Sequence, residues 1–249
     1  MTADAAAKGA RDYFPRGLDQ PSAGYRFSLD SLLLASFARG SGPRVLDIGC
    51  GCGVIGLAML LDDPGLEVTG LDAEPEMIAC AGSNTEKLGF DANFTAILGD
   101  VREVRKNRPF EPETFDAAVC NPPYRDPETG RTPQGGRLAA RFEERAEIDD
   151  FVRAAAFGLK NKGRFFAVFL PQRLAALFAA MSKAGLEPKR LRPVYGKAGE
   201  PAKIILVEAR KNGGPGLIME PPLVLYEGGK LTGAALGYCP RMGCNMGDA

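Results

Sequence analysis

Asn121, Pro122, Pro123 and Tyr124 bring polar acceptors and an aromatic ring together at the end of an apolar segment, residues 115–120. Neither proline has an N–H, and each forces the residue before it into extended geometry, so this loop is stiff. The Asn121 side-chain oxygen and the Pro122 carbonyl can accept both hydrogens of a planar NH2 group, while Tyr124 offers a stacking face. An ordinary proline-rich loop is the alternative interpretation.

Such a loop favours chemistry at a poorly nucleophilic nitrogen. The lone pair of an exocyclic amine is delocalised into its ring, and accepting both N–H bonds draws the nitrogen toward tetrahedral geometry. The same acceptors stabilise the positive charge that grows on nitrogen as it reacts. The product nitrogen then loses its proton readily, so no side-chain base is required. This agrees with a chain that contains no histidine, the commonest general base and metal ligand.

Three carboxylates lie at the ends of three successive apolar segments. Asp47 stands two residues before a glycine-rich loop, and Asp72 and Asp100 end the next two apolar segments. Glycines at alternate positions let a backbone turn tightly and approach a ligand, and open parallel sheets bind ligands at the carboxyl ends of their strands. The pattern predicts a nucleotide-like cofactor held by Asp47, Asp72, Asp100, Gly49, Gly51 and Gly53.

Two other interpretations of these residues remain open. Gly51, Gly53 and Gly56 also match the G-x-G-x-x-G dinucleotide fingerprint, which favours an NAD-dependent oxidoreductase but is a weak signal alone. Asp47 and Asp100 can also serve only to cap helices.

The apolar pattern alternates between strands and helices. It predicts a Rossmann-like, doubly wound α/β fold with a seven-stranded, mostly parallel sheet, whose last two strands form an antiparallel hairpin at the edge. The expected strands are 44–48, 67–71, 94–98, 115–120, 163–170, 186–194 and 202–209, and the expected helices are 27–38, 51–61, 75–88, 148–159 and 173–184.

Composition predicts a single domain over residues 1–249, with a loosely ordered arm at 1–24 and a C-terminal tail at 228–249. The 31 basic and 31 acidic residues cancel, so no global positive field indicates nucleic acid. No apolar segment is long enough to cross a membrane and no basic leader is present, which favours the cytoplasm. The six cysteines are expected to be reduced thiols and not ligands of a metal. No oligomeric state follows from the pattern.

Together these motifs resemble the class I S-adenosylmethionine-dependent methyltransferases, over roughly residues 25–227. The N-P-P-Y motif resembles the branch that methylates amino or amide nitrogens, and residues 27–34 resemble the helix before the glycine loop in bacterial tRNA adenine-N6 methyltransferases acting on valine tRNA. The resemblance implies that the glycine loop holds the methionine end of the cofactor, Asp72 the ribose and Asp100 the adenine. It also implies that Asp30 and Asn121 contact the cofactor.

The resemblance implies a structured RNA substrate, with adenine N6 in tRNA as the target. Asn121, Pro122 and Tyr124 are then catalytic, and the residues expected to contact substrate are Pro123, Tyr124, Arg125, Arg131 and Arg141. A basic set near the C-terminal strands can add contacts to RNA phosphates or can be a solvated charged face: Lys183, Lys189, Arg190, Arg192, Lys197 and Lys203. A glutamine N5 methyltransferase acting on a release factor and a non-catalytic RNA-binding protein are the alternatives. Phe142 departs from relatives that often carry histidine there, and the segment from Cys239 to Cys244 has no recognised counterpart.

Overall fold

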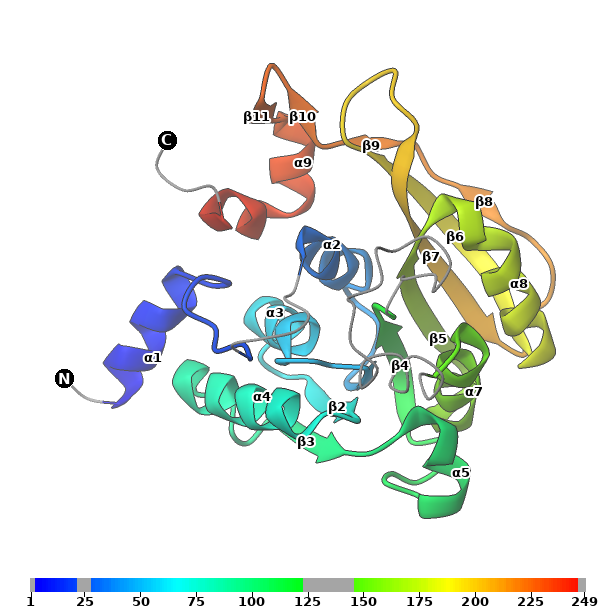
Figure 1. The fold of residues 1–249 in the computed structure, drawn as a ribbon, viewed down its shortest axis with the longest axis horizontal. Helices are drawn as coiled ribbons and strands as arrows, with labels where there is room; N and C mark the ends of the chain where they lie inside the picture. The colour runs from blue at the N-terminus through cyan, green and yellow to red at the C-terminus, as the bar shows by residue number, and fades with distance from the viewer. Residues whose placement is uncertain (1–2, 22–27, 123–145, 246–249) are drawn as a thin grey trace, which may run out of the picture.

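The computed structural model describes residues 3–21, 28–122 and 146–245, which form a central sheet with helices on both faces (Figure 1). The helices are α1 (Ala3–Asp12), α2 (Leu29–Phe37), α3 (Val54–Asp62), α4 (Pro75–Leu88), η1 (Val101–Glu103), α5 (Val104–Asn107), α7 (Ile148–Gly158), η2 (Pro171–Arg173), α8 (Leu174–Lys183), α9 (Gly233–Tyr238) and η3 (Pro240–Asn245). The strands are β1 (Arg44–Ile48), β2 (Glu67–Asp72), β3 (Phe94–Leu98), β4 (Phe115–Cys120), β5 (Leu159–Phe169), β6 (Leu186–Tyr195), β7 (Ala202–Lys211), β8 (Ile218–Met219), β9 (Leu223–Val224), β10 (Tyr226–Glu227) and β11 (Lys230–Leu231).

The sheet follows the order β3-β2-β1-β4-β5-β7-β6-β8, and β9 also pairs with β6. The five strands from β3 to β5 are parallel, while β7 runs antiparallel to both β5 and β6. The predicted doubly wound, mostly parallel α/β fold is confirmed. The strand order reverses beside β1, where folds of this class bind their ligands.

Alternating side chains of each strand feed two separate cores. Val45 packs on the face covered by α2, α3, α4 and α9, whereas Leu46 packs on the face covered by α5, α7 and α8. Both residues are fully buried. Burial on both faces explains why the strands appear in the sequence as continuous apolar runs and not as an apolar–polar alternation.

The hairpin of β6 and β7 is present, but it does not end the sheet as predicted. The two-residue strands β8 and β9 both pair with β6 in parallel, so the sheet formed by the described residues has nine strands and not the predicted seven. Strand β5 also begins earlier than predicted, because Leu159 pairs with Phe115 across a bulge before the regular register starts at Arg164. The polar residues 160–162 within that extension gave no strand signal in the sequence.

Both ends of the described chain are more ordered than predicted. Residues 3–12 form α1 in place of a loosely ordered arm, and Phe14 behind it is only 1% exposed. Beyond residue 227, α9 and η3 pack onto α2, where Cys239 and Met242 enter the core. Each end is therefore held by contacts to segments far away in the sequence.

The carboxyl ends of the first four strands lie side by side along one side of the sheet. Ile48 of β1 pairs with Leu71 of β2 on one side and with Cys120 of β4 on the other, and Asp72 pairs with Leu98 of β3. The loops that carry the predicted chemistry therefore leave the sheet side by side. Within the described ranges, no helix has both the length and the apolar character that a membrane span requires.

Candidate active site

The glycine loop leaves β1 in a conformation that only glycine adopts freely. Gly49, Gly51 and Gly53 have φ values of 68°, 55° and 85°, in the left-handed region that residues with a side chain rarely occupy. The loop is fastened to β2 because the Gly49 and Cys50 N–H groups donate to the Leu71 carbonyl at 2.8 and 3.0 Å. The predicted tight turn between β1 and α3 is confirmed.

Gly56 has a packing role. A Cβ atom at this position would lie 2.6 Å from the Phe94 ring and 2.7 Å from a Val68 methyl group, so only glycine lets α3 approach the sheet this closely. Helix–sheet packing thereby explains the third glycine of the apparent dinucleotide fingerprint, and this is also the role of that position in dinucleotide-binding folds.

Asp72 joins the end of β2 to the glycine loop. Its Oδ2 atom accepts a 2.8 Å hydrogen bond from the Gly51 N–H, and its Oδ1 atom accepts one of 3.0 Å from the Glu74 N–H. Burial raises the pKa of this carboxyl, while the two backbone donors lower it. The structure therefore brings Asp72 and the loop together as the sequence predicts.

Asp47 is completely buried below the loop. Its Oδ2 atom accepts a 3.0 Å hydrogen bond from the Gly56 N–H in the first turn of α3, and its Oδ1 atom has no hydrogen-bond partner among the described residues. Burial raises the pKa of Asp47 to about 7. This geometry supports the helix-capping interpretation of Asp47, in which it shapes the loop from beneath.

Asp100 follows β3 and is bound by the arginine two residues later. Its carboxylate accepts from the Arg102 backbone N–H at 2.8 Å and from the guanidinium, with an Nη2 to Oδ2 distance of 2.5 Å. The hydrogen bonds from the Arg102 side chain lower the pKa of Asp100. Asp100 nevertheless lies beside Asp72, since the Gly99 N–H donates to the Asp72 carbonyl at 2.8 Å.

Asn121 ends β4 and contacts α2. Its Nδ2 atom donates a 3.0 Å hydrogen bond to the Oγ atom of Ser31, a residue that is 3% exposed. Asp30 precedes Ser31, and burial raises the pKa of its carboxyl while the nearby Lys203 opposes the shift. The structure thus places the predicted residues Asp30 and Asn121 close together. Ser31 was missed, although a serine inside the apolar run of α2 was a detectable signal.

Five predicted substrate-contacting residues lie outside the described residues: Pro123, Tyr124, Arg125, Arg131 and Arg141. Pro122 is described and is buried.

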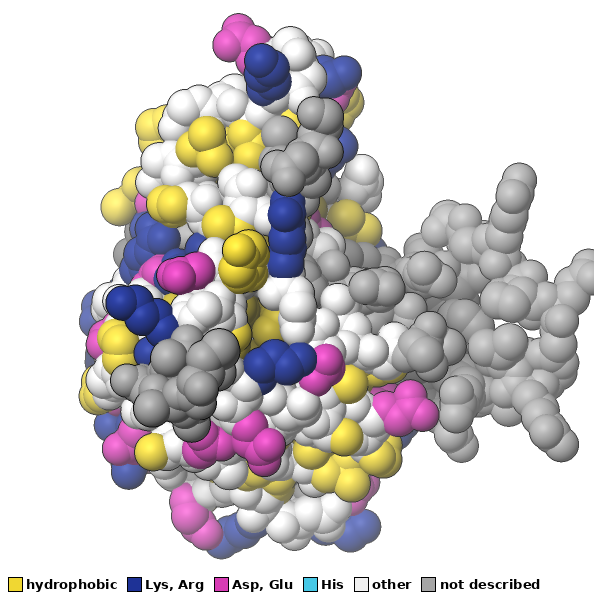
Figure 2. All heavy atoms as spheres, turned by 90° about the vertical axis from the view of Figure 1, so that its left-hand side faces the viewer, with side chains coloured by type: hydrophobic (Ala, Val, Ile, Leu, Met, Phe, Trp, Pro, Cys, Tyr) yellow, Lys and Arg dark blue, Asp and Glu magenta, His cyan; other side chains and the backbone are white. Residues whose placement is uncertain are grey.

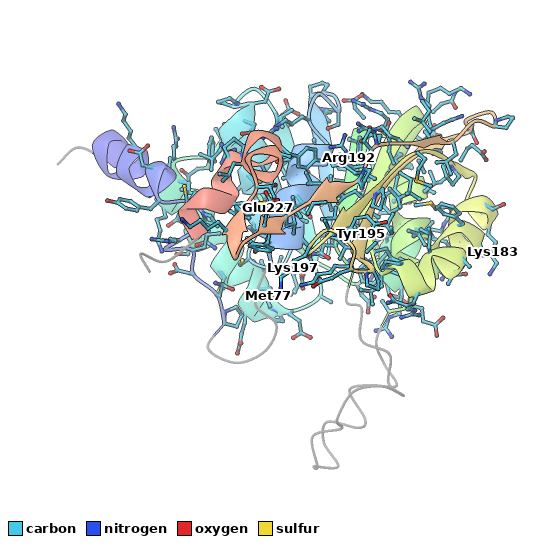
Figure 3. The ribbon with its side chains drawn as sticks, turned by 90° about the horizontal axis from the view of Figure 1, so that it is seen from above. Met77, Lys183, Arg192, Tyr195, Lys197 and Glu227 are labelled. Atoms are coloured by element: carbon cyan, nitrogen blue, oxygen red, sulfur yellow. The ribbon has the colours of Figure 1, made fainter. Side chains whose placement is uncertain are left out.

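The basic residues near the C-terminal strands do not form one patch. Arg190 and Arg192 pair with Glu220, at 2.9 and 2.5 Å, and Lys183 pairs with Asp149 at 3.2 Å. In Figure 3, Lys183 on α8 and Lys197 after β6 lie well apart. Figure 2 shows a different face, the α1 side of the molecule, and there the described acidic and basic side chains are also mixed, without a region of one sign. The solvated-face interpretation fits most of this set.

The cysteines are all free thiols. Burial raises the pKa of Cys52 in the glycine loop to about 12, so its thiol stays protonated and unreactive at neutral pH. The described residues hold no group of three or more His, Cys, Asp or Glu side chains arranged to bind a metal ion.

Residues 39–181 match the family described as methyltransferase domain. The chain is 35% identical over 108 residues to the release factor glutamine methyltransferase of Bordetella pertussis, an alignment that covers 43% of this chain and 37% of that enzyme. It is 30% identical over 140 residues to the tRNA1(Val) (adenine(37)-N6)-methyltransferase of Yersinia pseudotuberculosis, covering 56% of this chain and 54% of that enzyme. The chain therefore spans about half or less of the length of the curated relatives it matches.

Among solved structures, a predicted O-methyltransferase from Agrobacterium tumefaciens superposes with a TM-score of 0.70 at 24% identity. The superposition covers 85% of this chain and 96% of that one. At this identity the likeness shows the fold alone.

Proposed function

The chain belongs to the methyltransferase domain family, and we propose that it transfers the methyl group of S-adenosyl-L-methionine to the exocyclic amino group of a base in structured RNA, with adenine N6 in a tRNA as the substrate. The observation that carries this proposal is the placement of Asn121. It stands at the carboxyl end of β4, held by Ser31, on the strand next to the one that leads into the glycine loop.

The residues at the carboxyl ends of β1 and β2 fit the cofactor. A carboxylate offers about four lone-pair sites. Each Asp72 oxygen accepts one backbone N–H, which leaves capacity for ribose hydroxyls. The backbone of the glycine loop can approach a ligand closely because Gly49 and Gly51 carry no side chain. When bound, S-adenosyl-L-methionine supplies an electrophilic methyl group on a sulfonium.

The remaining chemistry belongs to Asn121 and Pro122. The Asn121 side-chain oxygen and the Pro122 carbonyl accept the two N–H bonds of the substrate amine and stabilise the positive charge that develops on nitrogen. Oriented attack in a site that excludes water supplies most of the remaining rate. The proton then leaves to solvent, which agrees with the absence of histidine from the chain.

Two relatives support different substrates. The name of the Yersinia enzyme specifies adenine N6 of a tRNA, whereas the name of the Bordetella enzyme specifies a glutamine of a release factor. Both targets carry NH2 on a planar group, so the acceptors at Asn121 suit either. The match to the tRNA enzyme covers more of this chain, and residues 27–34 resemble the same group, which favours RNA. The family match also favours methyl transfer over the NAD-dependent alternative.

One experiment separates these functions. The protein is incubated with methyl-labelled S-adenosyl-L-methionine and with tRNA, rRNA or release factors, and the products are digested. We expect label in N6-methyladenosine from tRNA. Label confined to methylglutamine would establish the release-factor alternative, and cofactor binding without any transfer would indicate a non-catalytic RNA-binding protein.

A further inference from the structure

Asn84 of α4 is completely buried and bridges two distant parts of the chain. Its Nδ2 atom donates to the carbonyl of Cys52 in the glycine loop at 3.0 Å and to the carbonyl of Asp19 at 2.9 Å. Its Oδ1 atom accepts from the Asp19 N–H at 2.7 Å. The Asn84 amide therefore pairs with both backbone groups of Asp19, as a neighbouring strand would.

The N-terminal segment, residues 3–21, runs beside α4 (Figure 1). Arg11 donates to the Leu88 and Gly89 carbonyls at the end of α4, at 2.7 and 3.1 Å, and its guanidinium lies over the Phe90 ring. The Asp19 carboxylate accepts from two further α4 residues, Ser83 at 2.7 Å and Lys87 at 2.8 Å. The N-terminal segment is thus held against α4 at two points, Arg11 and Asp19.

We propose that Asn84 is a positioning residue that couples docking of the N-terminal segment to cofactor binding at the glycine loop; this inference rests on the proposed function. Cys52 lies between Gly51 and Gly53, so fixing its carbonyl fixes the peptides that face the cofactor. Asn84 is in turn fixed by Asp19. Thermodynamic linkage requires the effect to be reciprocal.

The coupling follows from the hydrogen bonds that Asn84 shares between the two sites. If the N-terminal segment leaves α4, Asn84 loses two of its three hydrogen bonds, and the side of the amide that Asp19 covered is opened to water. Water then competes for the amide, so Asn84 is no longer held in the orientation that donates to the Cys52 carbonyl.

Asn93 provides a matched control. Its Nδ2 atom also bridges two backbone carbonyls, those of Pro64 and Leu66, at 3.2 and 3.1 Å. These carbonyls precede β2, at the amino ends of the parallel strands, whereas the glycine loop lies at their carboxyl ends. Asn93→Ala should therefore lower the unfolding temperature without changing cofactor affinity.

The test uses the full chain and S-adenosylhomocysteine, the demethylated product of the cofactor, measured by calorimetry and by amide hydrogen exchange. We expect the ligand to slow exchange at the Asp19 N–H of the wild type. Asn84→Ala should weaken binding by about 10-fold and abolish that protection. Asn84→Asp, which keeps an acceptor for Asp19 but loses both donors, should do the same if the alanine variant does not fold.

The outcomes separate the two proposals. A wild type that does not bind S-adenosylhomocysteine would overturn the proposed cofactor and the coupling with it. Normal binding by the wild type together with unchanged affinity in a folded Asn84 variant, or ligand binding that leaves Asp19 exchange unaltered, would overturn the coupling alone.

Discussion

The amide nitrogen of Asn121 donates a 3.0 Å hydrogen bond to the hydroxyl of Ser31, across 90 positions of sequence. This contact engages the nitrogen end of the amide, so the Ser31 hydroxyl does not occupy its oxygen. A side chain that accepts a hydrogen bond from a substrate amine must present its oxygen. Ser31 therefore sets the orientation on which the proposed role of Asn121 depends.

Removal of the Ser31 hydroxyl should impair catalysis without affecting the cofactor. We expect Ser31→Ala to lower the single-turnover rate of methyl transfer by about 10-fold and the free energy of unfolding by about 1 kcal/mol, the net value of one hydrogen bond. Ser36→Ala, in the same helix and also buried, is the control and should leave the rate unchanged. Equal rates of methyl transfer in Ser31→Ala and Ser36→Ala would show that Ser31 does not orient Asn121.

Asn121→Ala tests the transition-state role directly. The loss of one acceptor aimed at developing charge should reduce the single-turnover rate by about 100-fold or more, while affinity for S-adenosylhomocysteine stays near that of the wild type. Quench-flow kinetics and calorimetry measure the two quantities separately. Normal methylation by Asn121→Ala would instead support the interpretation of the loop at residues 121–124 as an ordinary proline-rich turn.

Asp72→Ala should weaken cofactor binding by one to two decades, about 1.4–2.7 kcal/mol, because hydrogen bonds to the ribose and the anchor of the Gly51 N–H are both lost. Asp116 offers a control, since its carboxylate also accepts a backbone N–H, that of Arg44, but at the amino end of β1. Asp116→Ala should bind the cofactor normally. An unchanged dissociation constant for Asp72→Ala would place the ribose elsewhere.

Arg102 is predicted to compete with the cofactor for Asp100. The four hydrogen bonds from Arg102 fill the lone-pair sites of this carboxylate, so at least one must be released before adenine can bind there. Arg102→Ala should tighten S-adenosylhomocysteine binding by up to about 5-fold, in line with the weakness of exposed ion pairs. The gain should vanish in a variant that also carries Asp100→Asn. Weaker binding by Arg102→Ala would show that the arginine assists the cofactor.

Asp47 should make stability fall as the pH rises. Its pKa is raised from 3.8 to about 7 on folding, so the folded chain binds a proton between these values that the unfolded chain has released. The free energy of unfolding should decrease from about pH 4 to about pH 7, by at most about 1.4 kcal/mol per pH unit from this group. Urea unfolding at pH 5 and pH 8 should show a smaller pH dependence in Asp47→Asn than in the wild type. Identical slopes would contradict this assignment.

Most of the fold could be predicted because strong local signals mark its elements. β4 and α4 begin and end where predicted, since β4 is a buried run that stops before two prolines, and α4 starts at a proline and ends before a left-handed glycine. The helix at Ala3–Asp12 could not be predicted in this way. Its small, charged residues give little apolar pattern, and its docking depends on Arg11 reaching carbonyls 77 and 78 positions away.

The site could be predicted only in part. Parallel strands place their carboxyl ends together, so the proximity of Asp72 and Asp100 followed from the order of the elements. The same pattern did not show that Asp47 would be sealed beneath the loop, or that Arg102 would occupy Asp100. Ser31 and Asn84 were missed because their partners lie 90 and 65 positions away, and no local spacing encodes such a pair.

Because Cys239 and Met242 cover α2, this helix obtains its complete set of neighbours late in synthesis. The Cys239 thiol meets the Leu32 carbonyl from 207 positions further along the chain, and Arg241 pairs with Asp62 at the end of α3. The first of these helices, α2, carries Ser31, and the second, α3, follows the glycine loop. On a ribosome-bound chain that ends before residue 233, the part of α2 that Cys239 and Met242 cover is therefore still open to solvent.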